Sequence, residues 1–148
     1  MNWHIKAFTE LSHLELWQIY KSRVDVFVVE QNCPYPEVDE KDLHALHVFA
    51  EQDGQLAAYC RIIAEDALVK IGRVLVVPSF RELGLGRVLM QQALQAVQQR
   101  FPKQEIHIQA QLYLQRFYES LGFHRISDEY LEDGIPHIDM VWRKREAA

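Results

Sequence analysis

Long apolar runs and cysteines are both scarce in this sequence. No apolar stretch approaches the roughly 20 residues that span a bilayer, and the N-terminus has no basic segment followed by an apolar run. The two cysteines, Cys33 and Cys60, lack a CxxC spacing, which argues against a zinc-finger motif and a disulfide framework. These absences predict a soluble, cytoplasmic protein with free thiols.

Basic residues are also in the minority. Lysine and arginine total 16 against 21 aspartates and glutamates, for a net charge of −5. This balance argues against nucleic-acid and anionic-membrane binding and mildly favours cationic partners. The 148 residues, 49% of them hydrophobic, suit a single domain spanning 1–148.

Hydrophobic periodicity predicts an α/β (α+β) order of elements. Strands are expected at 3–8, 45–51, 56–64, 67–77, 105–110, 123–126 and 137–143, and helices at 12–32, 84–101 and 112–121. This order indicates a mixed sheet with helices on both faces. Segment 31–42, with two prolines and four carboxylates, reads as a surface loop.

Local signals support several of these elements. Ser12 and Glu15 have the spacing of a helix capping box, Asp53–Gly54 is a hairpin turn signal, and Gly122 suits a left-handed helix cap. The uninterrupted apolar run 74–77 is typical of a strand buried on both faces. The first helix is expected to turn these residues toward the core: Leu14, Trp17, Tyr20, Val24, Phe27 and Val28.

The turn 81–86, Arg-Glu-Leu-Gly-Leu-Gly, lies between the apolar strand and the next helix. Such a turn presents unpaired backbone N–H groups at the positive end of a helix dipole, which binds anions. Glycine at Gly84 and Gly86 lets the backbone approach a phosphate, and Arg81 and Arg87 can add charged hydrogen bonds. Leu89 stands in place of the third glycine of a dinucleotide fingerprint and no GK[ST] follows, so NAD and ATP are both disfavoured.

Two linked motifs carry a family resemblance. The RxxGxG spacing after an apolar strand resembles motif A of the GNAT superfamily of N-acetyltransferases, and segment 117–123, Phe-Tyr-Glu-Ser-Leu-Gly-Phe, is similar to its motif B. Segments 27–35 and 134–138 resemble the ElaA-like branch of that superfamily. The resemblance implies the GNAT fold, a mostly antiparallel sheet of six to seven strands, with a V-shaped gap between the fourth and fifth strands.

The resemblance also implies acetyl-CoA as the donor. The fourth strand would be bulged near 75–77, where Leu75 and Val77 would pair with the pantetheine arm and the N–H of Val76 or Val77 would bind the thioester oxygen. Tyr118 would be the general acid, although its apolar neighbours also suit a core residue. The implied CoA-binding residues are Leu75, Val76, Val77, Arg81, Glu82, Leu83, Gly84, Leu85, Gly86, Arg87, Gln111 and Tyr118.

Acetylation of an amine also requires its deprotonation. Glu30 and His137 are candidates for the base or the acceptor site, because the fold would place their segments on either side of the acceptor opening; a solvated glutamate and a structural histidine are the alternatives. Arg61 and Arg73 suit either a substrate carboxylate or structural ion pairs.

The cluster Asp42, His44 and His47 is a weak metal motif, because strand geometry separates its side chains, and no metal is expected. The acidic run 37–42 reads as a solvated loop or as an attractor for a cationic amine.

The sequence therefore favours an N-acetyltransferase acting on a primary amine of a small molecule or peptide by direct attack in a ternary complex. A CoA-binding regulatory module without transferase activity and a scaffold without a ligand remain alternatives. No motif encodes the acceptor, whose specificity would lie in loops 30–42 and 128–136. No nucleic acid or membrane partner is expected, and an edge strand at 137–143 would allow a homodimer.

Overall fold

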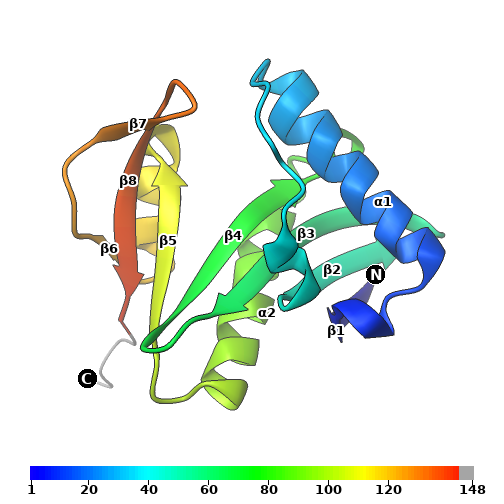
Figure 1. Cartoon of the computed structure of the whole chain (residues 1–148), viewed down its shortest axis with the longest axis horizontal. Coiled ribbons are helices and arrows are strands. Elements are labelled where there is room, and N and C mark those ends of the chain that lie inside the picture. The colour runs from blue at the N-terminus through cyan, green and yellow to red at the C-terminus, as the bar shows by residue number, and fades with distance from the viewer. Residues whose placement is uncertain (144–148) are drawn as a thin grey trace.

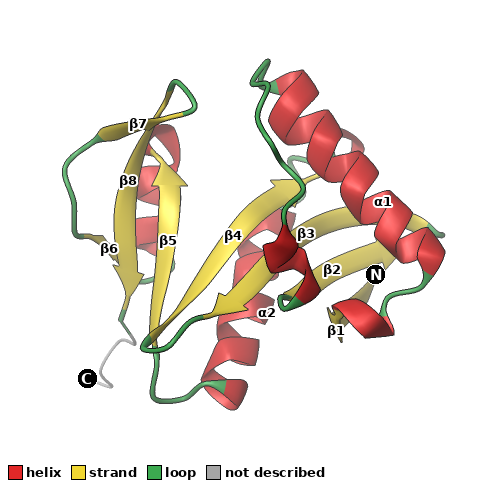
Figure 2. Cartoon of the chain, viewed as in Figure 1, coloured by secondary structure: helices red, strands yellow, loops and turns green. Residues whose placement is uncertain are grey.

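The computed structural model describes residues 1–143 as one twisted sheet with helices on both faces (Figures 1 and 2). The strands are β1 (Asn2–Ala7), β2 (Leu46–Gln52), β3 (Gln55–Ala64), β4 (Leu68–Val76), β5 (Glu105–Gln111), β6 (Phe123–Arg125), β7 (Tyr130–Glu132) and β8 (Ile135–Trp142). The helices are α1 (His13–Arg23) with a π-helical continuation (Val24–Glu30), α2 (Leu85–Arg100) and α3 (Gln115–Ser120). Short 3₁₀ turns occupy Phe8–Glu10, Glu40–Leu43, Pro78–Phe80 and Leu112–Leu114.

The strand order is β1-β2-β3-β4-β5-β8-β6, with β7 paired to β8. Neighbouring strands run antiparallel except for the parallel pair β4–β5. The mixed, mostly antiparallel sheet is thus confirmed, with the short strand β7 added. Strand β8 lies between β5 and β6, so the expectation that it is a sheet edge open to dimer pairing is wrong.

The local signals hold in the structure. The Ser12 hydroxyl accepts from the Glu15 N–H at 3.1 Å, while Glu15 accepts from the Ser12 N–H at 2.8 Å, which completes the capping box. Asp53 and Gly54 both adopt positive φ, 52° and 77°, as a two-residue hairpin turn of type I′ requires. These elements formed as expected because each depends on residues only a few positions apart.

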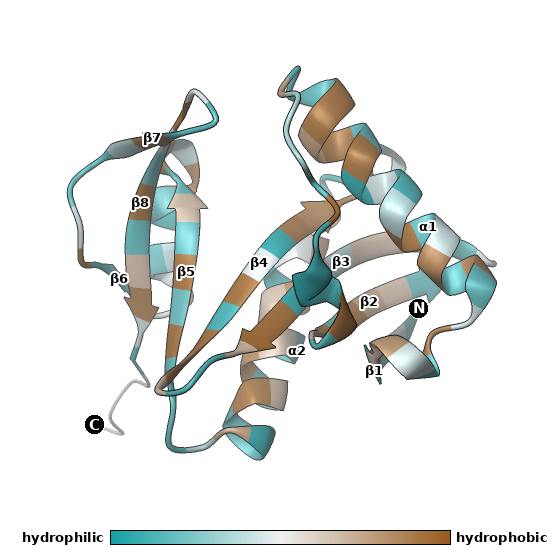
Figure 3. Ribbon diagram, viewed as in Figure 1, coloured by the Kyte–Doolittle hydropathy of each residue, from teal (hydrophilic) through white to brown (hydrophobic). Residues whose placement is uncertain are grey.

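The buried face of α1 differs from the expected one. Leu14 and Trp17 are exposed, Trp17 by 61%, whereas Ile19, Arg23 and Val26 are buried. The apolar pattern alone predicts that Arg23 is not a core residue. In the structure it is buried because its guanidinium pairs with buried carboxylates. The wider π-helical turns after Arg23 also break the 3.6-residue spacing; Figure 3 shows that this end of the helix is largely hydrophobic.

The acidic segment 37–42 supplies those carboxylates, so the prediction of a solvated loop is wrong for two of its residues. Glu37 is 4% exposed and Asp42 1%. Arg23 donates from Nε to Glu37 at 2.7 Å and from Nη1 to Asp42 at 2.7 Å. Burial would raise the pKa of Asp42, but the hydrogen bonds from Arg23 and Arg61 outweigh it and lower that pKa.

Arg61 and Arg73 join the same cluster, which supports their reading as structural ion pairs. Arg61 donates to both carboxylate oxygens of Asp39, at 2.8 and 3.1 Å, and to Asp42 at 3.0 Å. Arg73 forms an ion pair with Glu37 and donates to its carbonyl oxygen at 2.9 Å. We call these six residues the arginine–carboxylate network: Arg23, Arg61, Arg73, Glu37, Asp39 and Asp42.

Two apolar cores flank the sheet. The larger packs α2 and α3 against one face and includes Val48, Ile71, Leu89 and Ile108. The smaller packs α1 against the other face around residues such as Ile19. In the part of the chain covering residues 1–143, no helix combines the length and apolar character needed to cross a membrane.

Strands β4 and β5 separate after a short contact. They pair only through Leu68–Lys70 and Glu105–His107, and then diverge into a V (Figure 1). Strand β4 has an extra residue between Gly72 and Leu75, where Arg73 takes a φ of 52°. The bulge therefore precedes the expected position, 75–77. The run 74–77 is not buried on both faces either: only Leu75 is buried, because the divergence leaves one edge of β4 open.

Replacing Arg23 with methionine removes the guanidinium and leaves Glu37 and Asp42 buried without their main partner. We expect the free energy of unfolding, measured in urea, to fall by about 3–5 kcal/mol. As a control, Lys21→Met removes only an exposed ion pair with Asp25 and should cost less than about 1 kcal/mol. Similar small effects of both substitutions would show that the network contributes little to stability.

Candidate active site

A cleft of about 780 Å³ occupies the V between β4 and β5. Its walls come from the π-helical turn, the segment 31–41, the open edge of β4, the inner side of β5 and the β7–β8 turn. A smaller hollow of about 270 Å³ lies over the turn before α2. Both are lined by Val76, Arg81, Gly86 and Phe117, so they form one continuous site.

The turn before α2 has the geometry of an anion site. Gly84 caps the helix in the left-handed region, with φ of 74°, where a side chain would be strained. The first-turn N–H groups of Leu85, Gly86 and Arg87 have no partner within the helix, and α2 is 16 residues long, so its dipole favours an anion there. The backbone thus fits a phosphate group.

The two arginines of this turn are already engaged. Arg81 donates from both Nη atoms to the Glu30 carboxylate, at 2.6 and 2.7 Å, and from Nε to the Val76 carbonyl at 2.9 Å. Arg87 donates to the Ser120 hydroxyl at 2.9 Å. The hydrogen bond from Arg81 lowers the pKa of Glu30, and a carboxylate held in this way is a poor proton acceptor. Glu30 therefore ties the end of the π-helical turn to the anion site.

The backbone of β4 presents alternate residues to the cleft. The Val77 N–H donates to the Ala57 carbonyl at 2.9 Å, and the Val77 carbonyl accepts from the Phe80 N–H at 2.8 Å. Because antiparallel pairing alternates, Leu75 also directs its backbone groups toward β3. The expectation that Leu75 and Val77 pair with a ligand through their backbone is wrong. Val74 and Val76 face the open edge instead.

Tyr118 is buried in α3 and lines the cleft. Its ring packs edge-on against Phe117 and Phe123, with centroids 5.2 and 5.7 Å apart. Burial raises the pKa of its phenol, so the hydroxyl stays protonated at neutral pH. Tyr118 thus contributes both to the core and to the cleft.

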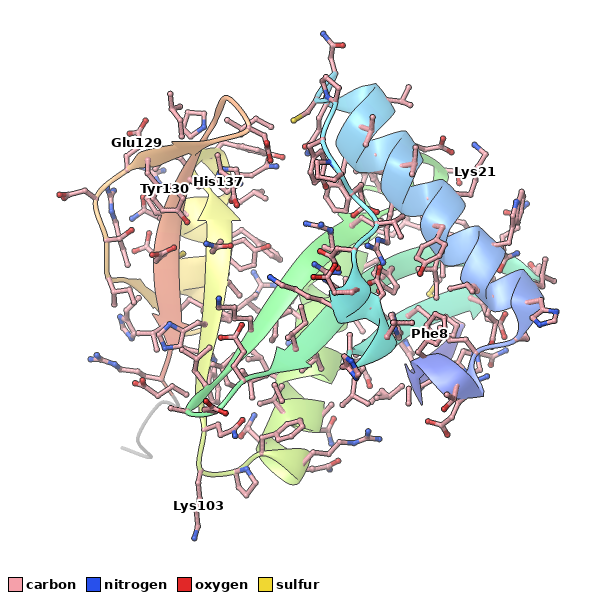
Figure 4. The ribbon with its side chains drawn as sticks, viewed as in Figure 1. Phe8, Lys21, Lys103, Glu129, Tyr130 and His137 are labelled. Carbon is pink, nitrogen blue, oxygen red and sulfur yellow. The ribbon has the colours of Figure 1, made fainter. Side chains whose placement is uncertain are left out.

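His137 lies on the opposite wall, beside Tyr130 (Figure 4). Its Nδ1 is 2.7 Å from the Ile135 carbonyl oxygen. Since a carbonyl only accepts, Nδ1 carries the proton, and Nε2 of the neutral ring is a proton acceptor. Nε2 lies 3.8 Å from Oε2 of Glu132, a carboxylate that would stabilise the protonated ring.

Two contacts join the walls of the V at its mouth. Gln111 of β5 donates to the Gln31 side-chain oxygen at 3.3 Å, and the Cys33 thiol donates to the Asp133 carbonyl at 3.5 Å. Gln111 was expected among the CoA-binding residues, and Gln31, Cys33 and Asp133 lie in the two loops expected to set acceptor specificity, but the contacts between them were not expected. The paired residues lie 80 and 100 positions apart in sequence, so no local pattern could have found these contacts.

Residues 1–143 contain no group of three or more His, Cys, Asp and Glu side chains placed to hold a metal. In the cluster considered from the sequence, His47 is enclosed instead: Nε2 contacts the Asp42 carbonyl at 3.0 Å and Nδ1 the Tyr59 hydroxyl at 2.6 Å. Burial lowers the pKa of His47, which favours a neutral structural histidine.

Comparison with known proteins agrees with this geometry. Residues 18–144 match the family model described as an acetyltransferase (GNAT) domain. A UPF0039 protein of Schizosaccharomyces pombe is 49% identical over 138 residues, which cover 91% of this chain and 92% of the relative.

Solved structures give the same result. Escherichia coli ElaA superposes with a TM-score of 0.93 at 37% identity, covering 97% of this chain and 100% of that one. An acyl-CoA N-acyltransferase from Pseudomonas aeruginosa superposes with a TM-score of 0.92 at 41% identity, covering 96% and 99%. The chain belongs to the GNAT acetyltransferase family, whose fold serves an acyl-CoA donor and an acceptor substrate. Within that family it is one of the ElaA-like proteins, as the sequence motifs predicted.

Valine at Gly84 should weaken acyl-CoA binding, because its side chain strains the turn that presents the N–H groups. Saturation of the wild type with acetyl-CoA at about 100 Kd should stabilise it by about 2.7 kcal/mol, seen as a rise in Tm, and Gly84→Val should lose most of that rise. Gly54→Val is the matched control: Gly54 has a φ of 77° and is equally uncrowded, but lies in the distant hairpin turn. An equal rise in both variants would exclude the turn as the binding element.

Proposed function

We propose that this protein is an acetyl-CoA-dependent N-acetyltransferase that modifies a primary amine of a small molecule or peptide by direct attack in a ternary complex. The open edge of β4, which leads directly into the anion-binding turn, carries the proposal. An extended pantetheine arm can add to Val74 and Val76 while its pyrophosphate reaches Gly84 and Gly86. The acetyltransferase description of the matching family model supports acetyl-CoA as the donor.

The N–H of Val76 is the donor for the thioester oxygen in this proposal. The Val76 carbonyl accepts a hydrogen bond from Arg81, and the backbone of Val76 faces the cleft. A fixed N–H directed at the oxygen stabilises the negative charge that develops as the amine attacks. The C–N bond then forms and the C–S bond breaks.

His137 is the proposed base, in preference to Glu30. An alkylamine with a pKa of about 10.4 is mostly protonated at pH 7, so attack requires a proton acceptor. Nε2 of His137 fills that role with its tautomer set by the Ile135 carbonyl, and Glu132 stabilises the imidazolium that results. Glu30 is engaged by Arg81 and has a lowered pKa.

Tyr118 is the proposed acid. The leaving thiolate belongs to a thiol with a pKa of about 8.5. Burial raises the pKa of Tyr118, so its phenol stays protonated and stabilises the departing thiolate by donating a hydrogen bond; as CoA leaves, the thiolate takes its proton through Tyr118 and solvent returns a proton to the phenol. The buried free thiols of Cys33 and Cys60 support a reducing compartment such as the cytoplasm.

Turnover with a panel of amines tests the proposed function directly. Purified protein with acetyl-CoA should release free thiol in an amine-dependent manner, and mass spectrometry should find the product heavier by one acetyl group. Acetyl-CoA binding without turnover on any amine would instead identify a CoA-binding module. The absence of both binding and turnover would indicate a scaffold.

Tyr118→Phe and His137→Gln should each lower kcat by roughly 10²–10⁴-fold and leave the Kd for acetyl-CoA unchanged. The loss in His137→Gln should shrink as the pH approaches the amine pKa of about 10.4, because the substrate then deprotonates without help. Tyr20→Phe, which removes a hydroxyl outside the cleft, serves as the control. Full activity of either variant would remove that residue from the mechanism.

A further inference from the structure

Neither backbone conformation nor crowding within the chain requires a glycine at Gly72, in the interior of β4. Glycine weakens a strand, and where it occurs it often marks the close approach of a ligand. Gly72 does not adopt a positive φ, and a Cβ added to it would meet nothing within 4 Å. A Cβ at this position would therefore meet no steric conflict, and the space above it opens into the cleft. This pattern suits a position kept small for a bound molecule.

The space over Gly72 lies on the face of the sheet opposite α2. Ile71 packs into the core on the α2 side, so Gly72 faces the other way, and its cross-strand partner is Arg61. On β5, Ile108 is buried on the α2 side, which leaves Gln109 on the same face as Gly72. Gly72 is thus the floor of a subsite between Arg61 and Gln109.

This end of the cleft is cationic. The arginine–carboxylate network is balanced, with three arginines and three carboxylates. Lys41 and Lys70 also line the cleft; Lys70 forms an exposed ion pair with Glu65, so Lys41 adds the positive charge that has no ion-pair partner among the described residues. Arg61 is 5% exposed, and its Nε has no hydrogen-bond partner among the described residues. An anionic group in this part of the cleft would be attracted by these positive charges.

The other end of the cleft is acidic. Glu132 and Asp133, on the β7–β8 turn, line it beside His137, whereas Glu30 is neutralised by Arg81. The level of each end along the V follows from strand register. His137 pairs with Gln111, and continuing the parallel register from Lys70 and His107 brings Gly72 level with Gln109. Gly72 and His137 thus lie at different levels along the V, on strands that flank β5.

We propose that the acceptor is an amine that also carries an anionic group, a carboxylate or a phosphate. The amine lies at His137 and the acidic end, and the anionic group lies over Gly72 near Arg61, Lys41 and Lys70. This inference rests on the proposed function and refines the general preference for cationic partners that the net charge suggests.

Four amines of matched length test the inference: 5-aminopentanoate, 4-aminobutyl phosphate, pentylamine and 1,5-diaminopentane. The two anionic amines should exceed pentylamine in kcat/KM by about tenfold or more, and the diamine should be the poorest substrate. The better of the two anionic amines identifies the group that is bound. Equal or faster turnover of pentylamine or the diamine overturns the inference and leaves the proposed function intact, whereas binding of acetyl-CoA without turnover on any amine overturns the proposed function.

Gly72→Ala tests the subsite from the side of the protein. The added Cβ enters open space, so Tm should equal or exceed that of the wild type, while KM for the preferred anionic amine should rise about tenfold and the Kd for acetyl-CoA should stay unchanged. Lys41→Gln and Lys70→Gln should each reduce the preference for the anionic amine over pentylamine. Lys103→Gln, remote from the cleft, is the matched control (Figure 4). An unchanged KM in Gly72→Ala, with an unchanged preference in both lysine variants, would overturn the inference.

Discussion

The arginine–carboxylate network is the constraint on which the rest of the structure depends. Arg23 comes from α1, Glu37 and Asp42 from the following segment, and Arg73 from the bulge of β4. Buried charges are tolerated only when paired, so displacing any of these elements would leave a buried charge without its partner. The network therefore holds one wall of the cleft against the strand that forms its floor. It also keeps Arg73 in a left-handed conformation that would otherwise be unfavourable.

The bulge at Arg73 links the network to the chemistry of the site. Beyond it, β4 pairs only with β3, so the backbone of Val74 and Val76 is left facing the cleft. The same strand then enters the turn that caps α2. The open edge of β4, which can bind an extended ligand, therefore runs directly into the N-terminus of α2, which can bind an anion. One donor molecule can contact both. The Glu30–Arg81 ion pair ties the end of the π-helical turn to the turn before α2.

Features that depend on neighbouring residues were predictable from the sequence. The Ser12–Glu15 cap, the Asp53–Gly54 turn and the turn before α2 each arise from residues a few positions apart. The inward face of α1 and the burial of Glu37 were not predictable, because both depend on ion pairs between distant segments. Whether the backbone of Val77 is free to pair with a ligand likewise depends on strand register, which the hydrophobic periodicity of the sequence does not determine.

The brief contact between β4 and β5 has a consequence for folding. Strands β1 to β4 are antiparallel neighbours, and β2 to β4 are joined by short turns, whereas β5 reaches β4 only after the crossover through α2. Contacts of longer sequence separation form more slowly, so the hairpins of the first half can form before β5 and β8 dock. The cleft exists only once both halves are in place. A donor molecule that contacts both halves would bind only after they have docked, and would therefore stabilise the docked, native state.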